Sequence, residues 1–286
     1  MNLATGTSKA VEPTEMRWDP DRLPPFPAIA LKALNLMAGT DTSLHKLCDL
    51  IRSDPAFSTA ILRIANSPLV GFSKEITSVM QASILLGFRR LKSVAITVGL
   101  KAYLERSCSP ILKSCWRHSV ACAIVAERSA KAAASMDKDF AHTAGIMHDI
   151  GRVAMAAAMP QAYARVVATG ADRPQDLLQV EAELCGIDHC QAGSSLVTAW
   201  DLPKVFLEIT SRHHDPETRL KGTASVVRPS CMLADALGFT VVKYRSSRDY
   251  AEILTEFPGP ARNHFPADAK VLASEIANEI EVIESA

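Results

Sequence analysis

The chain has 286 residues, 48% of them hydrophobic, and its 31 basic side chains balance 31 acidic ones. This length allows one large or two small domains with a sizeable buried core. Zero net charge argues against broad electrostatic binding to nucleic acid or to an anionic membrane. The chain has no apolar run long enough to span a bilayer and no secretory signal at its polar start, so we expect a cytoplasmic protein.

Seven cysteines are scattered along the chain without a CxxC pair, which is typical of reduced, buried thiols. Cys115 and Cys122 flank His118 on one helical face, so a metal site of thiolate and imidazole is one interpretation. The alternative, which we favour, is that both thiols pack in the core as small apolar side chains.

The first half of the chain predicts five short helices. They follow a polar segment, residues 1–22, that we expect to be disordered because it lacks apolar periodicity. Capping residues and a proline in the first turn mark two of the helix starts. These helices form a predicted N-terminal lobe over residues 23–107. They are expected over 28–38, after the cap run 41–43, from Asp54-Pro55, and over 76–86 and 91–104 with Gly87 between them.

The second half repeats this pattern with more alanine, whose small side chain lets helices approach closely. Phe239–Val242 is its only run with strand character, and 240–266 is expected to be irregular or partly helical. The prediction is an all-α fold of two packed helical lobes, the second over 108–240, followed by an irregular segment and terminal helix over 241–286. Helices are expected over 111–136, 139–157, 160–170, 174–184, 189–199, 203–212, 225–238 and 268–283.

Histidine and aspartate are the residue types most able to carry chemistry in this chain. Imidazole and carboxylate are the ligands that Mn, Fe, Co or Zn prefer. An adjacent His-Asp pair can bridge two metals or hold one from two sides, and an all-helical core can assemble such a site. The candidate metal ligands are His118, His148, Asp149, His189, His213, His214 and Asp235, whereas His45, His142 and His264 are given no role.

These residues also have purely structural interpretations, which the sequence leaves open. The His148-Asp149 pair fits a helix cap, and His118 fits a half-buried helix residue. His189 fits a helix start. The His213-His214 pair fits a helix end, where a positive imidazole complements the helix dipole. Asp235 fits a solvated residue near the end of an alanine-rich helix.

The run Ala144–Arg152, which contains the His148-Asp149 pair, resembles the signature of the HD superfamily of metal-dependent phosphohydrolases. The wider chain, roughly residues 23–240, resembles the HDOD family. That resemblance implies an all-α fold with an HD-like bundle as its second lobe, and a role in bacterial signal transduction. The matching segments are Leu23-Pro24, Pro27, Asp54-Pro55, 62–67, 82–87, Glu183–Gly193, Trp200–Pro203 and His213-His214.

The resemblance also implies roles for the candidate residues. In the simplest HD enzymes the ligands are a first His, the His-Asp pair and a distal Asp, which correspond here to His118, His148, Asp149 and Asp235. HD-GYP phosphodiesterases, which hydrolyse cyclic di-GMP, add a lone His and a His-His pair, matched by His189, His213 and His214. Arg152 closes the signature and is expected to face a phosphate. With His213 or His214 as proton carriers, the catalytic candidates are Arg152, His213 and His214.

Two departures from the HD-GYP pattern argue against cyclic di-GMP hydrolysis. The sequence continues as Asp215-Pro216-Glu217-Thr218 after the His-His pair, where the family has Gly-Tyr-Pro. Ser114 stands where a glutamate is expected, one turn before His118.

The sequence leaves three candidate functions for the chain. We favour a non-catalytic signalling module that binds a partner protein or ligand, with the N-terminal lobe as its interaction surface. The alternatives are a metal-dependent HD-type phosphohydrolase acting on a nucleotide or cyclic dinucleotide, and a nucleotide receptor without turnover. Whether the chain is an enzyme depends on whether the His/Asp residues bind a divalent metal, which would generate a hydroxide nucleophile near neutral pH.

Overall fold

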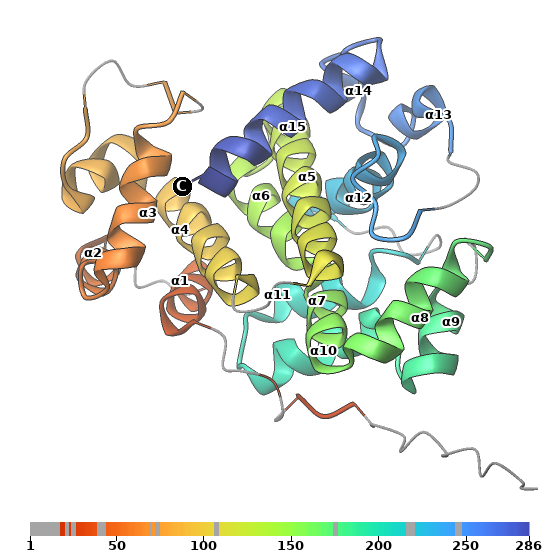
Figure 1. Ribbon diagram of the computed structural model, residues 1–286. Coiled ribbons are helices and arrows are strands. Elements are labelled where there is room, and N and C mark those ends of the chain that lie inside the picture. The colour runs from red at the N-terminus through yellow and green to blue at the C-terminus, as the bar shows by residue number, and fades with distance from the viewer. Residues whose placement is uncertain are drawn as a thin grey trace, which may run out of the picture.

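The computed structural model describes residues 18–20, 23, 27–38, 44–68, 70–71, 75–105, 109–173, 177–215, 221–243 and 248–285. The regular elements in these ranges are helices, and no strand occurs there, so the all-α prediction is confirmed (Figure 1). No helix within these ranges is long and apolar enough to cross a membrane. Most of segment 1–22 and the proposed caps at 41–43 lie outside the described residues.

The first group of helices, α1 to α4, lies at the left of Figure 1 in red to yellow. The Asp54 carboxylate caps α3 by accepting a hydrogen bond from Phe57 N at 3.0 Å, and proline fills the first turn. Gly87 has a φ of 77°, so the predicted separation of two helices exists as a kink within α4. The bounds are Ala28–Ala38 for α1, Leu44–Arg52 for α2, Pro55–Ala65 for α3 and Val79–Leu104 for α4.

Helix α5 (Pro110–Ala133) is the centre of the second group, because α6, α7, α12, α14 and α15 all pack against it. A Cβ at Gly145 in α6 would overlap the backbone at Ala123 in α5, so the missing side chain permits this close approach. The other elements are α6 Lys138–Met147, α7 Ile150–Ala158, α8 Pro160–Gly170, α9 Leu177–Cys185, α10 His189–Ala199, α11 Lys204–Arg212, the 3-10 helix η3 Gly222–Val226, α12 Val227–Ala236, α13 Tyr250–Leu254, α14 Gly259–Arg262 and α15 Ala269–Ser285.

The single helix predicted over 139–157 is wrong. Helix α6 ends at Met147, α7 begins at Ile150, and the turn between them is the His148-Asp149 pair. Apolar periodicity continues through the turn, because Ile146, Met147, Ile150 and Val153 are all buried. The pattern therefore gave no sign of the break. The C-terminal segment is partly helical, as expected, through α13 and α14.

A continuous hydrophobic core joins the two groups of helices and includes Leu34 and Leu100 from the first and Val120 and Ile209 from the second. Because this core is continuous, it does not divide the molecule into two lobes at residue 107, and the proposed boundary there stays a prediction.

A polar cluster also crosses between the two groups. Glu127 of α5 lies 2.6 Å from Arg90 of α4 and accepts a hydrogen bond from His142 Nδ1 of α6 at 2.8 Å. The hydroxyl of Thr97 donates to Ser93 O at 3.1 Å, which leaves its oxygen free to accept from His142 Nε2 at 3.2 Å.

Glu127 should make stability depend on acid pH. Burial raises the pKa of Glu127, but the hydrogen bond and charge of His142, with those of Arg90, outweigh burial and bring the pKa from 4.5 to about 2. The stabilisation is therefore complete above pH 4.5 and is lost as the pH falls toward 2. We expect Glu127→Gln to lower the unfolding free energy at neutral pH by about 2 kcal/mol, as for a hydrogen bond between charged groups.

Urea unfolding at a series of pH values measures this effect, and the difference between wild type and Glu127→Gln should shrink below pH 4.5. Glu183→Gln is the matched control, because Glu183 forms an exposed ion pair with Arg173 at 2.9 Å and should contribute little. A constant difference between wild type and Glu127→Gln over the whole range would contradict the assignment.

Candidate metal centre

The break between α6 and α7 turns two side chains into the core. His148 follows α6 directly, and its backbone N donates to Ala144 O at 3.0 Å. Asp149 stands at the N-cap position of α7, but its side chain makes no capping hydrogen bond. Both residues are only 1% exposed. The Asp149 carboxylate is therefore directed away from the helix end that it would ordinarily cap.

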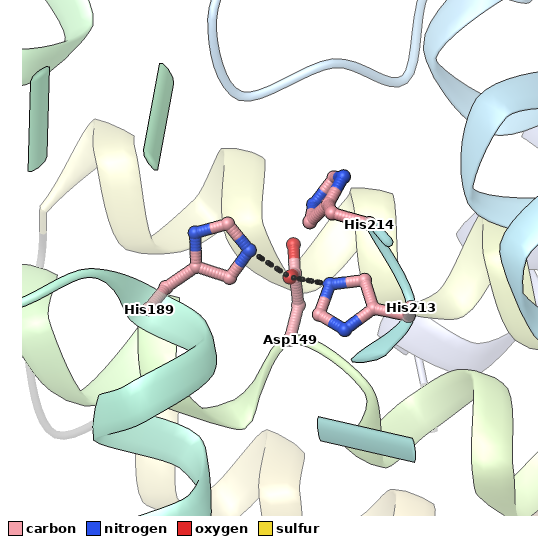
Figure 2. Close-up of side chains that lie close together, drawn as sticks. All are labelled: Asp149, His189, His213 and His214. Atoms are coloured by element: carbon pink, nitrogen blue, oxygen red, sulfur yellow. Dashed lines mark hydrogen bonds and ion pairs between the residues drawn. The ribbon is translucent and has the colours of Figure 1, made fainter. Parts of the chain in front are cut away.

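One oxygen of Asp149 faces the histidines of α10 and α11. Oδ1 lies 3.4 Å from His189 Nε2 and 3.2 Å from His213 Nε2. Figure 2 shows these two rings on opposite sides of the carboxylate, with His214 beside His213. His189 is the first residue of α10 and His213 follows the last residue of α11, so two helix ends converge on one oxygen.

The other oxygen, Asp149 Oδ2, faces α5, α6 and α7. It lies 3.0 Å from Arg152 Nε, 3.6 Å from His118 Nε2 and 3.9 Å from His148 Nε2. Burial raises the pKa of Asp149, but the positive charge of Arg152 and the nearby imidazoles outweigh it and hold the pKa well below its usual value. Asp149 is therefore an ionised carboxylate inside the protein.

Four of the imidazole rings share one orientation. In each of these four, Nδ1 donates outward to a fixed acceptor, and Nε2 points inward. The outward acceptors are Phe239 O for His118 at 2.8 Å, Gly145 O for His148 at 2.7 Å, Glu181 Oε2 for His189 at 2.6 Å, and Ile209 O and Thr210 O for His213, both at 3.1 Å. Metal-binding histidines are characteristically held in this way, with the outward N–H fixing the tautomer.

Burial also favours the neutral form of three rings around Asp149. It lowers the pKa of His213 and lowers the pKa values of His148 and His214 well below their usual value. A neutral ring has one N–H, which His213 gives to backbone carbonyls, so its Nε2 lone pair faces the Asp149 carboxylate at 3.2 Å. Nε2 of His148 has no hydrogen-bond partner among the described residues. A cation bound between buried acceptors that face one another would stabilise this arrangement.

Glu181 belongs to the cluster, although the sequence gave no sign of it. One of its oxygens accepts from the N–H and the Nδ1 of His189, and the other accepts from Tyr163 Oη at 2.9 Å. Burial lowers the pKa of His189, but the charge of Glu181 outweighs burial and raises it well above its usual value. Glu181 therefore favours positive charge on this ring. Glu181 could not be recognised from the sequence, because a single glutamate in an amphipathic helix such as α9 looks like an ordinary surface residue.

Asp235 is placed differently from the expected arrangement, and Cys231, which was not singled out from the sequence, lies on the inward side of His118 instead. Asp235 Oδ1 lies 3.3 Å from His118 Nδ1, on the outward side of the ring, and the Asp235 side chain is 25% exposed. Cys231, one turn earlier on α12, places its sulfur 3.5 Å from the inward His118 Nε2. Burial lowers the pKa of His118, but Asp235 outweighs burial and raises it. The helical spacing of four residues was the only signal that could have pointed to Cys231.

Arg152 lies inside the cluster. Its side chain is 3% exposed, with Nε 3.0 Å from Asp149 Oδ2 and Nη2 3.3 Å from His189 Nε2. A guanidinium only donates, so this contact opposes the positive charge that Glu181 favours on the His189 ring. The predicted phosphate-facing role of Arg152 stays a prediction.

The predicted ligands other than Asp235, together with Cys231, form two groups. Within each group the ligand atoms lie within 4.8 Å of one another. With metal–ligand bonds of 2.0–2.2 Å, a tetrahedral ion holds its ligands about 3.4 Å apart. The separations of 3.2 Å and 3.4 Å from Asp149 Oδ1 to His213 and His189 agree with that value. The residues therefore fit a divalent metal. The two groups are Asp149, His189, His213 and His214, and His118, His148 and Cys231.

The profile of the HDOD domain family matches residues 23–216. The chain belongs to the HDOD domain family. An HDOD domain protein of unknown function from Geobacter sulfurreducens has a similar structure, with a TM-score of 0.75 and 23% identity over 93% of this chain and 92% of that one. A candidate phosphohydrolase from Shewanella amazonensis SB2B follows, with a TM-score of 0.67 and 20% identity over 93% and 94% of the two chains.

Other relatives of this HDOD chain are longer. A candidate signal transduction protein from Marinobacter aquaeolei VT8 has a TM-score of 0.59 and 19% identity, over 92% of this chain and 58% of that one. An uncharacterised protein of Treponema pallidum is 24% identical over 197 residues, which are 68% of this chain but only 38% of its own length. At these identities the solved structures establish the fold, and the site rests on the geometry above.

Close packing of α7 on α10 should be necessary for the centre. A Cβ at Gly151 would overlap His189 O and Gly193 N, which are backbone atoms that cannot turn aside. We expect Gly151→Ala to separate the two helices, to move His189 away from Asp149, and to destabilise the protein by about 1–3 kcal/mol through overpacking. Thermal unfolding and metal binding, both measured on the same preparation, would detect these changes.

The control is Gly259→Ala, because among the described residues no atom beyond its own helix and chain neighbours lies within 4 Å of a Cβ at Gly259. Metal binding and stability in Gly151→Ala equal to those of the control would show that the close approach of α7 and α10 does not position the site.

Proposed function

We propose that this HDOD chain is a non-catalytic signalling module whose buried His/Asp centre binds a divalent metal and thereby fixes the packing of its helices. The observation that carries the proposal is that acceptor atoms of several side chains face one another inside the buried core. His118, His148, Asp149, His189 and His213 are each at most 1% exposed, while their Nε2 and carboxylate atoms face one another.

The charge of the cluster supports metal binding. Two buried carboxylates, Asp149 and Glu181, both have a lowered pKa, because positive neighbours outweigh the burial that would raise it. Arg152 brings one permanent positive charge to this region. A divalent ion bound by the Nε2 atoms would offset the remaining negative charge, and Glu181 would stabilise a metal on His189 as it stabilises a proton. Mn, Fe, Co and Zn all accept such ligands.

The same enclosure argues for binding rather than turnover. A catalytic metal keeps an open position for water and substrate, and a phosphoester must reach that position. Here the ligand-type side chains are covered, and only His214 and Asp235 are partly exposed. The description of the Marinobacter relative as a candidate signal transduction protein agrees with a signalling role.

A metal-dependent phosphohydrolase is the second candidate, and the position of Asp149 favours it. Each carboxylate oxygen faces a different group of histidines, which is the arrangement of a carboxylate that bridges two metals. Structural relatives from Shewanella amazonensis SB2B are described as candidate phosphohydrolases, one of them metal-dependent. In such an enzyme Arg152 would bind the phosphate and His213 or His214 would carry the proton.

The metal prediction is tested on the purified protein. We expect a near-stoichiometric divalent metal in wild type, and His148→Ala should lose most of it, because Nε2 of His148 has no other partner among the described residues. His264→Ala is the control, since that histidine is exposed. Elemental analysis gives the metal content, and a chelator should lower the melting temperature of wild type but not of His148→Ala. Metal-free wild type that cannot be loaded would overturn the metal centre.

Turnover distinguishes the two candidates. A panel of cyclic dinucleotides and nucleoside monophosphates with added Mn²⁺ should show no hydrolysis by the metal-loaded protein. Melting shifts caused by the same compounds would indicate a nucleotide receptor. Hydrolysis by wild type that Asp149→Ala abolishes would establish the phosphohydrolase instead.

The interaction surface is expected on α4. Ile84 and Leu85 are 69% and 43% exposed, and they are the large hydrophobic side chains of the described N-terminal helices that are most accessible. We expect Ile84→Asp with Leu85→Asp to abolish cross-linking to a signalling partner in the source cells, because adjacent exposed apolar side chains are typical of binding sites. His148→Ala and Val271→Asp should retain the cross-link, since Val271 is exposed on α15. A partner lost only with His148→Ala would place the surface elsewhere.

A further inference from the structure

The sulfur of Cys231 occupies the inward side of His118. Cys231 is 2% exposed, and its Sγ lies 3.5 Å from His118 Nε2. A tetrahedral ion with ordinary zinc bond lengths would hold a sulfur and a nitrogen about 3.5 Å apart. Nε2 of His148 completes a triangle with these two atoms, all within 4.8 Å of one another. This nitrogen is buried and has no hydrogen-bond partner among the described residues, so it is aimed into the same space.

Asp235 cannot take that place in the arrangement seen here. Its carboxylate lies at His118 Nδ1, 3.3 Å away, and the same nitrogen donates to Phe239 O at 2.8 Å. Nδ1 and Nε2 are on opposite sides of the ring, so an ion at Nε2 lies on the side of Cys231 and Asp149. Asp235 is then a positioning residue that orients the ring and favours positive charge on it.

We propose that Cys231 is a metal ligand, and that with His118 and His148 it forms a sulfur-containing site selective for Zn²⁺ or Co²⁺ over Mn²⁺ or Mg²⁺. The inference rests on the proposed metal centre and specifies its ion. Asp149 Oδ2 lies 3.6 Å from His118 Nε2 and 3.9 Å from His148 Nε2, at distances suited to a fourth ligand. Thiolate sulfur favours Zn²⁺ and Co²⁺, whereas Mn²⁺ and Mg²⁺ favour oxygen ligands. On binding, the S–H bond breaks, a sulfur–metal bond forms, and the proton passes to solvent.

Cobalt substitution tests the proposal without an activity assay. The full-length protein is stripped with a chelator, kept reduced, and loaded with Co²⁺ alone. A cysteine ligand gives a thiolate-to-cobalt charge-transfer band in the near ultraviolet, which histidine and carboxylate ligands do not give. We expect the band in wild type and its loss in Cys231→Ser, with Zn²⁺ affinity reduced by about tenfold or more.

Cys122→Ser is the matched control. Cys122 is also fully buried, lies one turn after His118 on α5, and donates to Val227 O of α12 at 3.8 Å. It is in neither group of candidate ligands. The control should keep both the band and the affinity. Cys231→Asp supplies an oxygen ligand of similar reach, so it should lose the band, stay folded by circular dichroism, and shift the preference toward Mn²⁺.

The remaining outcomes distinguish a failure of the Cys231 proposal from a failure of the whole metal centre. Cobalt that binds wild type without the charge-transfer band overturns the role of Cys231 and leaves the His/Asp centre in place. A band that disappears in Cys122→Ser but persists in Cys231→Ser also overturns it. Wild type that binds no cobalt or zinc overturns both this inference and the metal centre on which it rests.

Discussion

The ionised carboxylate of Asp149 lies in the core, 1% exposed, and the second half of the molecule is arranged to compensate its charge. An isolated buried charge is far too unfavourable for a domain whose net stability is about 5–15 kcal/mol. The compensation comes from Arg152 on α7, from His118 on α5, and from His189 at the start of α10. Because these groups come from three helices, neutralising one carboxylate fixes the relative positions of all three.

The ends of helices α6 and α11 orient two of the histidines around Asp149. The last carbonyls of a helix have no partner within it, and here they orient imidazoles. Gly145 O in the last turn of α6 accepts from His148, and Ile209 O and Thr210 O in the last turn of α11 accept from His213. These bonds satisfy the carbonyls, select the tautomer, and direct Nε2 toward Asp149. The helix-end position of His213 is therefore compatible with the ligand interpretation, because Nδ1 serves the carbonyls and Nε2 faces the centre, while burial disfavours the positive ring that the dipole interpretation assumed.

Apolar periodicity was sufficient to predict nearly every helix, since most of them bury one face against α5 or α4. It could not predict the break at His148-Asp149, because buried side chains continue on both sides of the turn. The histidines and Asp149 were found from their residue types and from the resemblance to the HD enzymes. Glu181 and Cys231 were missed, because their contacts depend on how α9 and α12 pack, which local sequence does not encode. Asp235 was predicted as a ligand, but the side chain of α12 that lies near Nε2 of His118 is Cys231, one turn earlier on the same helix.

Arg152 explains how such a centre stays organised whether or not an ion is bound. Its guanidinium contacts Asp149 Oδ2 through Nε and His189 Nε2 through Nη2, so one planar group reaches two candidate ligands from different helices. An ammonium group is a point charge and could not span these two acceptors in fixed geometry. The guanidinium therefore maintains the packing of α7 on α10, while a bound ion would satisfy the inward lone pairs that one guanidinium cannot reach, those of His148 and His213. A centre held in this way can gain or lose an ion without losing its fold, which suits a module that transmits a signal by binding.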